Sequence, residues 1–306
     1  MRGTVSLALL LCISASLEAQ QRTPWGDPDI QGVWSNQNPV PLERPDALKG
    51  KSTLTAAEAA EFEKTSLDRL LKNFAEEVPI SGELNGIWLE TAKGKVAPSR
   101  ATSLVVDPPD GKVPYTPEGR KRWDATPKLG PPLPANKPED RALNERCITT
   151  DGLLAPNPFY NNVHQIVQSP GYVAILTEMM HEARIIPLDR RARLGPGVQM
   201  YVGDSRGRWE GQTLVVETTN FNDKKLFRGA TRQMQLVERF TRIDADTIDY
   251  RLTVTDPATF SGPWTIENGL RKADGDLYEV GCHEGNYGLR GILSGARAEE
   301  AAAAKP

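Results

Sequence analysis

Residues Gln233–Asp256 read QMQLVERFTRIDADTIDYRLTVTD, and this stretch decides the expected fold. From Ile248 to Val254, apolar side chains alternate with polar ones, which is the period-2 pattern of a strand with one buried face. Asp244-Ala245-Asp246 provides a turn before it. The stretch therefore predicts an antiparallel hairpin with one face in a core.

Glu238 is the unusual residue of this hairpin. The alternation that places Leu236 and Phe240 on the apolar face also places Glu238 there, between them. A carboxylate on such a face is costly unless a counter-ion or hydrogen bonds meet it. Glu238 is therefore the first candidate for a functional side chain or for a buried ion pair.

Proline divides the chain into two parts, because 18 of the 24 prolines lie between residues 20 and 160. Proline lacks a backbone donor and is rare in central strands. The first part is expected to be extended coil with helices at 56–73, from Pro117 and at 138–146, and one short strand at 102–107. From residue 163 onward, strand-like runs alternate with turns. Besides the hairpin, the expected strands are 163–168, 172–178, 184–188, 199–202, 213–218, 264–272 and 277–283.

These strands predict a mainly β fold, an antiparallel meander that closes as a lipocalin-like or calycin-like barrel, because closure removes exposed strand edges. Gly32 and Trp34 form the GxW pattern of such barrels. A β-sandwich is the alternative, while the absence of a blade-length repeat argues against a propeller. The expected parts are a signal peptide (1–19), a Pro-rich wrap (20–160), the barrel (161–292) and an Ala/Glu-rich tail (293–306) that frays.

The first twenty residues predict export to the periplasm or the outside of the cell. Arg2 precedes a short apolar run, and Leu17-Glu18-Ala19 resembles a cleavage site. The mature chain then keeps two cysteines, Cys147 and Cys282, which are expected to form a disulfide, with two buried free thiols as the alternative.

Charge and hydropathy exclude two classes of partner. The net charge is −3 and no Lys/Arg block is present, which argues against nucleic acid. No segment after residue 20 is apolar for long enough to span a bilayer. The expected partner is a small molecule or a glycan fragment.

Six segments together resemble a family of exported bacterial proteins labelled hypothetical. They are TPWGDPDIQGVW (23–34), YNN (160–162) with the following QIVQSPGYV, EMMHEARIIPLD (178–189), GDSRGRWEGQTLVVETTNF (203–221), ERFTRIDADTI (238–248) and CHEGNY (282–287). The resemblance covers nearly the whole mature chain and implies export, but no particular reaction. His164 stands where that family has an aromatic residue such as Tyr, which weakens the case for His164 as a catalytic group.

Ionisable residues within apolar strands suggest acid/base chemistry, because burial raises a carboxyl pKa and a histidine can share the proton transfer. Arg184 is expected to hold an anionic group or a developing oxyanion of a substrate. A polar grip on a sugar or an amide is expected from the residues before the first barrel strand, with a plain entry loop as the alternative. The catalytic candidates are Glu238, His181, Glu178, His283 and Glu284, and the grip consists of Tyr160, Asn161 and Asn162.

Two other interpretations of these residues stay open. Glu178, Glu238 and Arg184 can instead form a buried ion-pair network that fixes strand register. A metal site made of His181, His283 and a glutamate is also open, although His283-Glu284 lacks the second histidine of an HExxH motif. No other cofactor is expected. Ser205, within GDSR, is expected in a turn rather than as a nucleophile.

The sequence therefore predicts an exported acid/base enzyme, a lyase or hydrolase. Its substrate is expected to be small and polar, aromatic or glycan-derived, and to enter a barrel cavity. The alternative is a calycin-like protein that binds a small ligand without turnover.

Overall fold

The structure is a computed structural model of the 306-residue chain. It describes residues 22–38, 40–62, 64–65, 99–126, 134–149, 154, 163–189, 191–224 and 227–304. The predicted signal peptide, 1–19, lies outside the described residues. So does the second half of the predicted helix 56–73, whose described residues 56–62 and 64–65 are helical.

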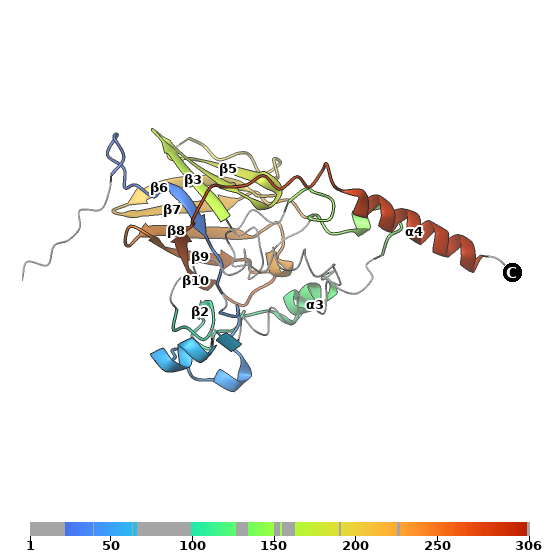
Figure 1. Ribbon diagram of the computed structural model, residues 1–306, viewed down its shortest axis with the longest axis horizontal. Helices are drawn as coiled ribbons and strands as arrows, with labels where there is room; N and C mark the ends of the chain where they lie inside the picture. Colours follow the sequence, from blue (N-terminus) through green and yellow to red (C-terminus); the bar gives the residue numbers. More distant parts are fainter. Residues whose placement is uncertain are drawn as a thin grey trace, which may run out of the picture.

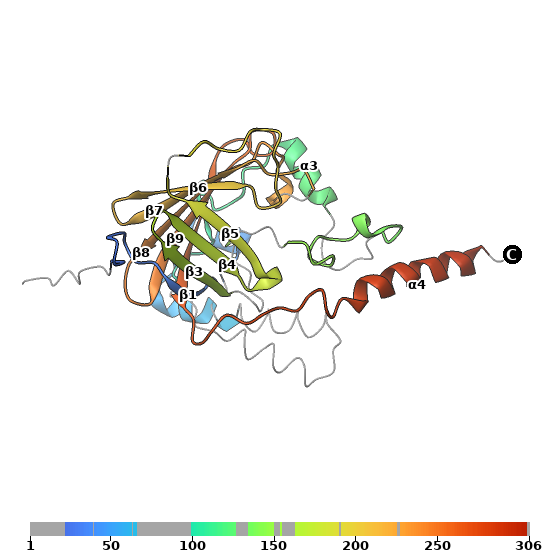
Figure 2. The same ribbon diagram turned by 90° about the horizontal axis from the view of Figure 1, so that it is seen from above.

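The protein is built on one antiparallel sheet that curls into a nearly closed barrel, which confirms the predicted calycin-like fold (Figures 1 and 2). Nine strands follow one another around it in the order β5-β4-β3-β1-β10-β9-β8-β7-β6, and the short β2 pairs with β10 off this path. The strands are β1 Gly32–Ser35, β2 Val105–Asp107, β3 Val163–Ser169, β4 Tyr172–Thr177, β5 Glu182–Pro187, β6 Asp204–Glu210, β7 Thr213–Thr219, β8 Gln235–Arg242, β9 Thr247–Thr255 and β10 Trp264–Lys272.

The N-terminal part of the chain is woven into the barrel as well as lying over it. Trp34 of β1 pairs with His164 on one side and with Lys272 on the other, so β1 joins β3 to β10. The sheet is therefore not confined to residues 161–292. The GxW segment supplies the strand that links the first and last hairpins of the meander.

The barrel has one seam, between β5 and β6, the two ends of the strand order. The two strands pack against each other, but no ladder of hydrogen bonds joins them within the described residues. Gly207 of β6 permits the close approach. A Cβ atom added there would lie 2.9 Å from Ile186 and 2.7 Å from Leu188. The seam is thus closed by side-chain packing rather than by backbone hydrogen bonds.

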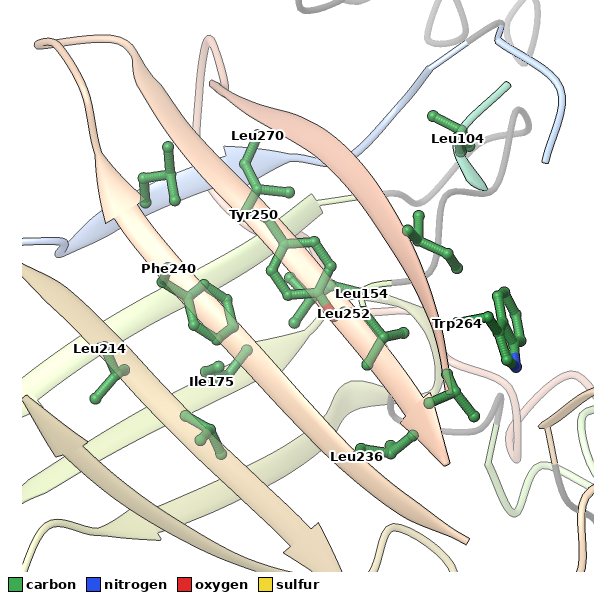
Figure 3. Packing of buried hydrophobic residues seen from close by; sticks show 14 of the residues in the cluster. Leu104, Leu154, Ile175, Leu214, Leu236, Phe240, Tyr250, Leu252, Trp264 and Leu270 are labelled. Atoms are coloured by element: carbon green, nitrogen blue, oxygen red, sulfur yellow. The ribbon is translucent and has the colours of Figure 1, made fainter. Parts of the chain in front are cut away.

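Buried apolar side chains from nearly all strands fill the barrel (Figure 3). Phe240 of β8 faces Tyr250 of β9, with ring centroids 5.0 Å apart. Near the start of β10, the ring of Trp264 lies 5.9 Å from Phe227. Leu154 belongs to the same cluster although it lies in no strand. The period-2 pattern that predicted the inward face of the hairpin is confirmed, because Leu236, Glu238 and Phe240 are all buried.

Helices lie outside the sheet. α3, Pro117–Ala125, begins as predicted, with Thr116 accepting a hydrogen bond from the Gly119 N–H and proline at the first position. A capping box begins the predicted helix 56–73, since the side chains of Thr55 and Glu58 each bond the other's backbone N–H. Short 3-10 turns occur at η1 Asp46–Leu48, η2 Pro138–Asp140, η3 Met179–His181 and η4 Phe227–Gly229.

Two predictions near the C-terminus are wrong. Residues 277–283 form no strand, because β1 already occupies the edge of β10 that such a strand would need. The tail does not fray from residue 293 but continues the helix α4, Tyr287–Ala303, which extends away from the barrel (Figures 1 and 2). Asn286 caps α4 by accepting from the Leu289 N–H, and the alanines that follow favour a helix.

Three further ranges differ from the prediction. Residues 203–212, where the sequence predicts no strand and a turn at Ser205, contain β6, whose charged side chains point outward and pair with neighbours, as Arg208 does with Glu217. Residues 199–202 contribute only an isolated bridge between Met200 and Phe221. The predicted helix 138–146 is limited to the 3-10 turn η2. Ser205 therefore lies in a strand rather than in a turn, and its hydroxyl is 2.9 Å from that of Thr218.

The disulfide between Cys147 and Cys282 is present, with the two Cα atoms 5.7 Å apart. It ties the segment before residue 150 to the segment that follows β10. Such a bond is typical of an oxidising compartment, as the export prediction requires. Within the described part of the chain, no helix is both long and apolar enough to cross a membrane.

Filling the seam should weaken the barrel. We expect Gly207→Val to lower the free energy of unfolding by about 1–3 kcal/mol, because its side chain must enter space held by Ile186 and Leu188. The matched control is Gly195→Val, since a Cβ at Gly195 meets no atom within 4 Å. The control should change stability by no more than about 0.5 kcal/mol. Urea titration of the oxidised protein measures both, and equal effects would contradict packing at the seam.

Candidate functional site

The centre of the barrel holds an ion pair between Glu238 of β8 and Arg184 of β5. Arg184 donates through both terminal nitrogens to the two carboxylate oxygens, at 2.7 and 3.0 Å. The hydroxyl of Tyr250 donates to Glu238 Oε1 at 3.0 Å. Glu238 is 0% exposed and Arg184 is 4% exposed. The structure therefore brings together two of the residues singled out from the sequence.

Burial and charge act on the pKa values of this cluster in opposite directions. Burial by itself lowers the pKa of Arg184, but the adjacent Glu238 carboxylate raises it above the ordinary value. Burial, and then the Glu238 charge, raise the pKa of the Tyr250 hydroxyl well above its ordinary value. Both side chains, Arg184 and Tyr250, therefore keep their protons near pH 7.

His164 of β3 lies in the same interior and is 3% exposed. Its Nδ1 lies 3.2 Å from the Thr177 hydroxyl, while Nε2 has no hydrogen-bond partner within the described part of the chain. Arg184 Nε is likewise buried without a partner there. Burial, helped by the Arg184 charge, lowers the pKa of His164 to about 3, so the ring is neutral near pH 7.

Glu178 lies at the end of β4, away from the central pair, and is buried. Burial raises the pKa of this carboxyl, and hydrogen bonds from the backbone N–H groups of Val163 and Tyr278 oppose that rise. Glu178 thus stands where β3, the β4–β5 turn and the segment after β10 meet. It has the property expected of a general acid, but it is not joined to Glu238.

The predicted histidines lie at the surface. His181 is exposed in the turn η3, where Met180 and His181 have φ values of 60° and 38°, and its Nδ1 is 3.2 Å from the Val280 carbonyl. His283 and Glu284 are exposed beside the disulfide. These three residues are therefore not part of the buried cluster around Glu238.

The remaining candidates divide into two groups. Tyr160, Asn161 and Asn162 lie outside the described residues, so their predicted ligand grip stays a prediction. For the proposed metal site, no group of three His, Cys, Asp or Glu side chains among the described residues is placed to share an ion.

A groove of about 630 Å³ lies between α3, the segment around η2 and the β7–β8 connection. Its lining includes Arg122 and Arg141, but both guanidinium groups are engaged. Arg122 donates to the Gly229 and Ala258 carbonyls, and Arg141 pairs with Glu145. Arg122 thereby holds α3 to the barrel, and Arg141 is paired within its own segment, so both cations serve the fold.

Sequence reasoning missed Tyr250 and undervalued His164. Tyr250 counted only as an apolar residue of its strand, although a buried tyrosine hydroxyl needs a partner. The signal that could have found it is its place on the same inward face as Glu238. For His164, the signal is the alternation of its strand. His164 shares one face with Ile166, and both are buried.

No protein-family model matches the sequence, and no curated protein matches it. The resemblance to exported bacterial proteins therefore stays a prediction. Function has to be inferred from the geometry of the chain itself.

Removing the charge of Glu238 should destabilise the fold strongly. Glu238→Gln leaves the Arg184 charge buried without a counter-ion, and we expect a loss of about 3–5 kcal/mol in unfolding free energy. Tyr250→Phe removes one hydrogen bond to a charged group and should cost about 1.5–3 kcal/mol. Equilibrium unfolding in urea measures both losses. A Gln variant as stable as the wild type would show that the pair does not hold the structure.

His164 should make the protein sensitive to acid. Because its folded-state pKa of about 3 lies below the usual 6.5, the unfolded chain takes up a proton that the folded chain refuses. The stability that the neutral His164 ring contributes to the fold is fully present above pH 6.5 and is lost as the pH falls towards 3. Relative to His164→Phe, the wild type should lose about 1.4 kcal/mol per pH unit in this range. Parallel pH profiles for the two proteins would contradict a buried neutral ring.

Proposed function

We propose that this protein is a calycin-like binding protein that takes a small molecule into its barrel. The observation that carries the proposal is that two of the buried polar atoms without a partner among the described residues, Arg184 Nε and His164 Nε2, lie beside the Glu238 ion pair in the interior of the barrel. Buried polar groups are normally hydrogen-bonded, because leaving one unpaired costs free energy. A ligand that bonds these atoms recovers that loss.

The state of Glu238 favours binding over catalysis. Its two carboxylate oxygens receive three hydrogen bonds, two from Arg184 and one from Tyr250. Both oxygens are therefore already engaged by donors, which leaves Glu238 poorly placed to receive a proton from a substrate. Abstracting a proton from a substrate would also require Glu238 to break a buried ion pair.

The acid/base enzyme, a lyase or hydrolase, is the second candidate, and Glu178 is the observation that favours it. Its pKa is raised by burial, as a general acid requires. His181, three residues later in the same turn, is exposed and supplies a group that can exchange protons with water. In this reading, the reaction takes place at the end of β4 and not at the central ion pair.

The ligand has to share the interior with the side chains that fill it. Leu154 is a buried residue that can yield space, because it belongs to the core cluster beside Leu252 of β9 but lies in no strand (Figure 3). Shortening it opens room beside the β9 side chains without cutting a strand. A ligand that now competes with Leu154 would then bind more tightly.

Binding and turnover can be separated with one pool of small neutral, acidic, basic and sugar compounds. Equilibrium dialysis against the mature protein should retain a compound at one per chain, chemically unchanged. Leu154→Ala should bind it at least about fivefold more tightly, since burying apolar groups contributes about 0.8 kcal/mol per methylene. Leu194→Ala, at an exposed leucine, is the control and should change nothing.

Two outcomes would contradict the binding proposal. The first is that the pool yields no retained compound with either protein. The second is conversion of a compound that stops in Glu178→Gln while that variant stays folded, which would establish the enzyme instead.

A further inference from the structure

The two unpartnered atoms lie on the same inner surface of the barrel. Arg184 of β5 pairs directly with Ile175 of β4, and His164 of β3 pairs with Thr177, the next inward residue of β4. Directly opposed residues of neighbouring strands point to the same face, so both side chains lie on the inner face of β3, β4 and β5. They flank one patch of wall whose centre is Ile175.

The charges around this patch are already balanced. Arg184 is neutralised by Glu238, and the His164 ring carries no charge near pH 7. Glu182, the other carboxylate that acts on Arg184, adds negative charge at the start of β5 and is bonded by Thr149. A carboxylate or phosphate entering here would be a buried anion without a counter-ion, which is strongly unfavourable.

The two unpartnered nitrogens also determine which ligand atoms can hydrogen-bond to this patch. Arg184 Nε–H can only donate, so it requires an acceptor. His164 Nε2 can donate or accept according to its tautomer, because the Thr177 hydroxyl can bond either form of Nδ1. A carbonyl or hydroxyl oxygen satisfies both nitrogens at once.

The wall around these atoms is apolar. Trp34 pairs with His164 from β1, and Ile166 pairs with Ile175 from β3. All three of these apolar side chains are at most 1% exposed. The ligand beyond its oxygen atom therefore meets hydrocarbon and aromatic surface.

We infer that the barrel binds a neutral, mainly apolar molecule whose carbonyl or hydroxyl oxygen accepts a hydrogen bond from Arg184 Nε and contacts His164 Nε2. This inference rests on the proposed binding function and adds the chemical class of the ligand. It excludes fatty acids and other anions as ligands of this position. It also gives Arg184 two tasks, because its terminal nitrogens hold Glu238 while Nε faces the ligand.

Three probes of nearly equal shape test the inference, namely acetophenone, ethylbenzene and benzoate. Titration of the folded wild-type chain, uniformly labelled with 15N, is followed by NMR, so that both the arginine Nε–H groups and the backbone amides of inward-facing residues are observed. Acetophenone should bind at least about fivefold more tightly than ethylbenzene, the contribution of one hydrogen bond. Benzoate should bind more weakly than both. The Nε–H resonance of Arg184 should move with acetophenone only, while that of Arg251, paired with Glu267 at the surface, should stay in place.

Failure of the inferred ligand class and failure of the binding function give different results. Binding of ethylbenzene as tight as that of acetophenone, or tighter binding of benzoate, would overturn the inferred ligand class and leave the binding function standing. If none of the three probes shifts the resonances of inward-facing residues, the binding function itself fails. A buried water molecule would then be the partner of Arg184 Nε and His164 Nε2.

Discussion

The bidentate ion pair between Arg184 and Glu238 is the interaction on which the barrel depends. It joins β5, one end of the strand order, to β8, the third strand from the other end. Between the two ends lies a seam that side-chain packing closes without a backbone ladder among the described residues. The ion pair thus spans the region where the sheet lacks backbone hydrogen bonds between neighbouring strands. Breaking a buried pair of this kind is strongly destabilising.

The N-terminal strand β1 and the disulfide also help to close the barrel. β1, from the N-terminal part, links β3 to β10, so it closes a gap in the meander that local hairpins leave open. The disulfide then ties the chain after β10 to the segment before residue 150. Both contacts join residues far apart in sequence. The interior is consequently enclosed, and Arg184 Nε and His164 Nε2 are buried within it.

The alternating pattern of the hairpin was enough to predict the inward position of Glu238, because strand periodicity is a local property. Its pairing with Arg184 depends on barrel closure, so sequence spacing left the ion pair as one of several alternatives. The strand β6 was missed because its charged side chains are paired on the outer face, as Arg208 is with Glu217. The absent strand at 277–283 was unpredictable for a similar reason, since β1 takes its edge from another part of the chain.

Hydrogen–deuterium exchange in Glu238→Gln tests most directly whether the ion pair holds the barrel closed. The variant is compared with the wild type strand by strand, under conditions where both remain folded. If the ion pair closes the seam, the backbone amides of β5 and β6 lose protection first, while those of β9 and β10 keep theirs. Equal loss of protection in all strands, or none in β5 and β6, would contradict that role.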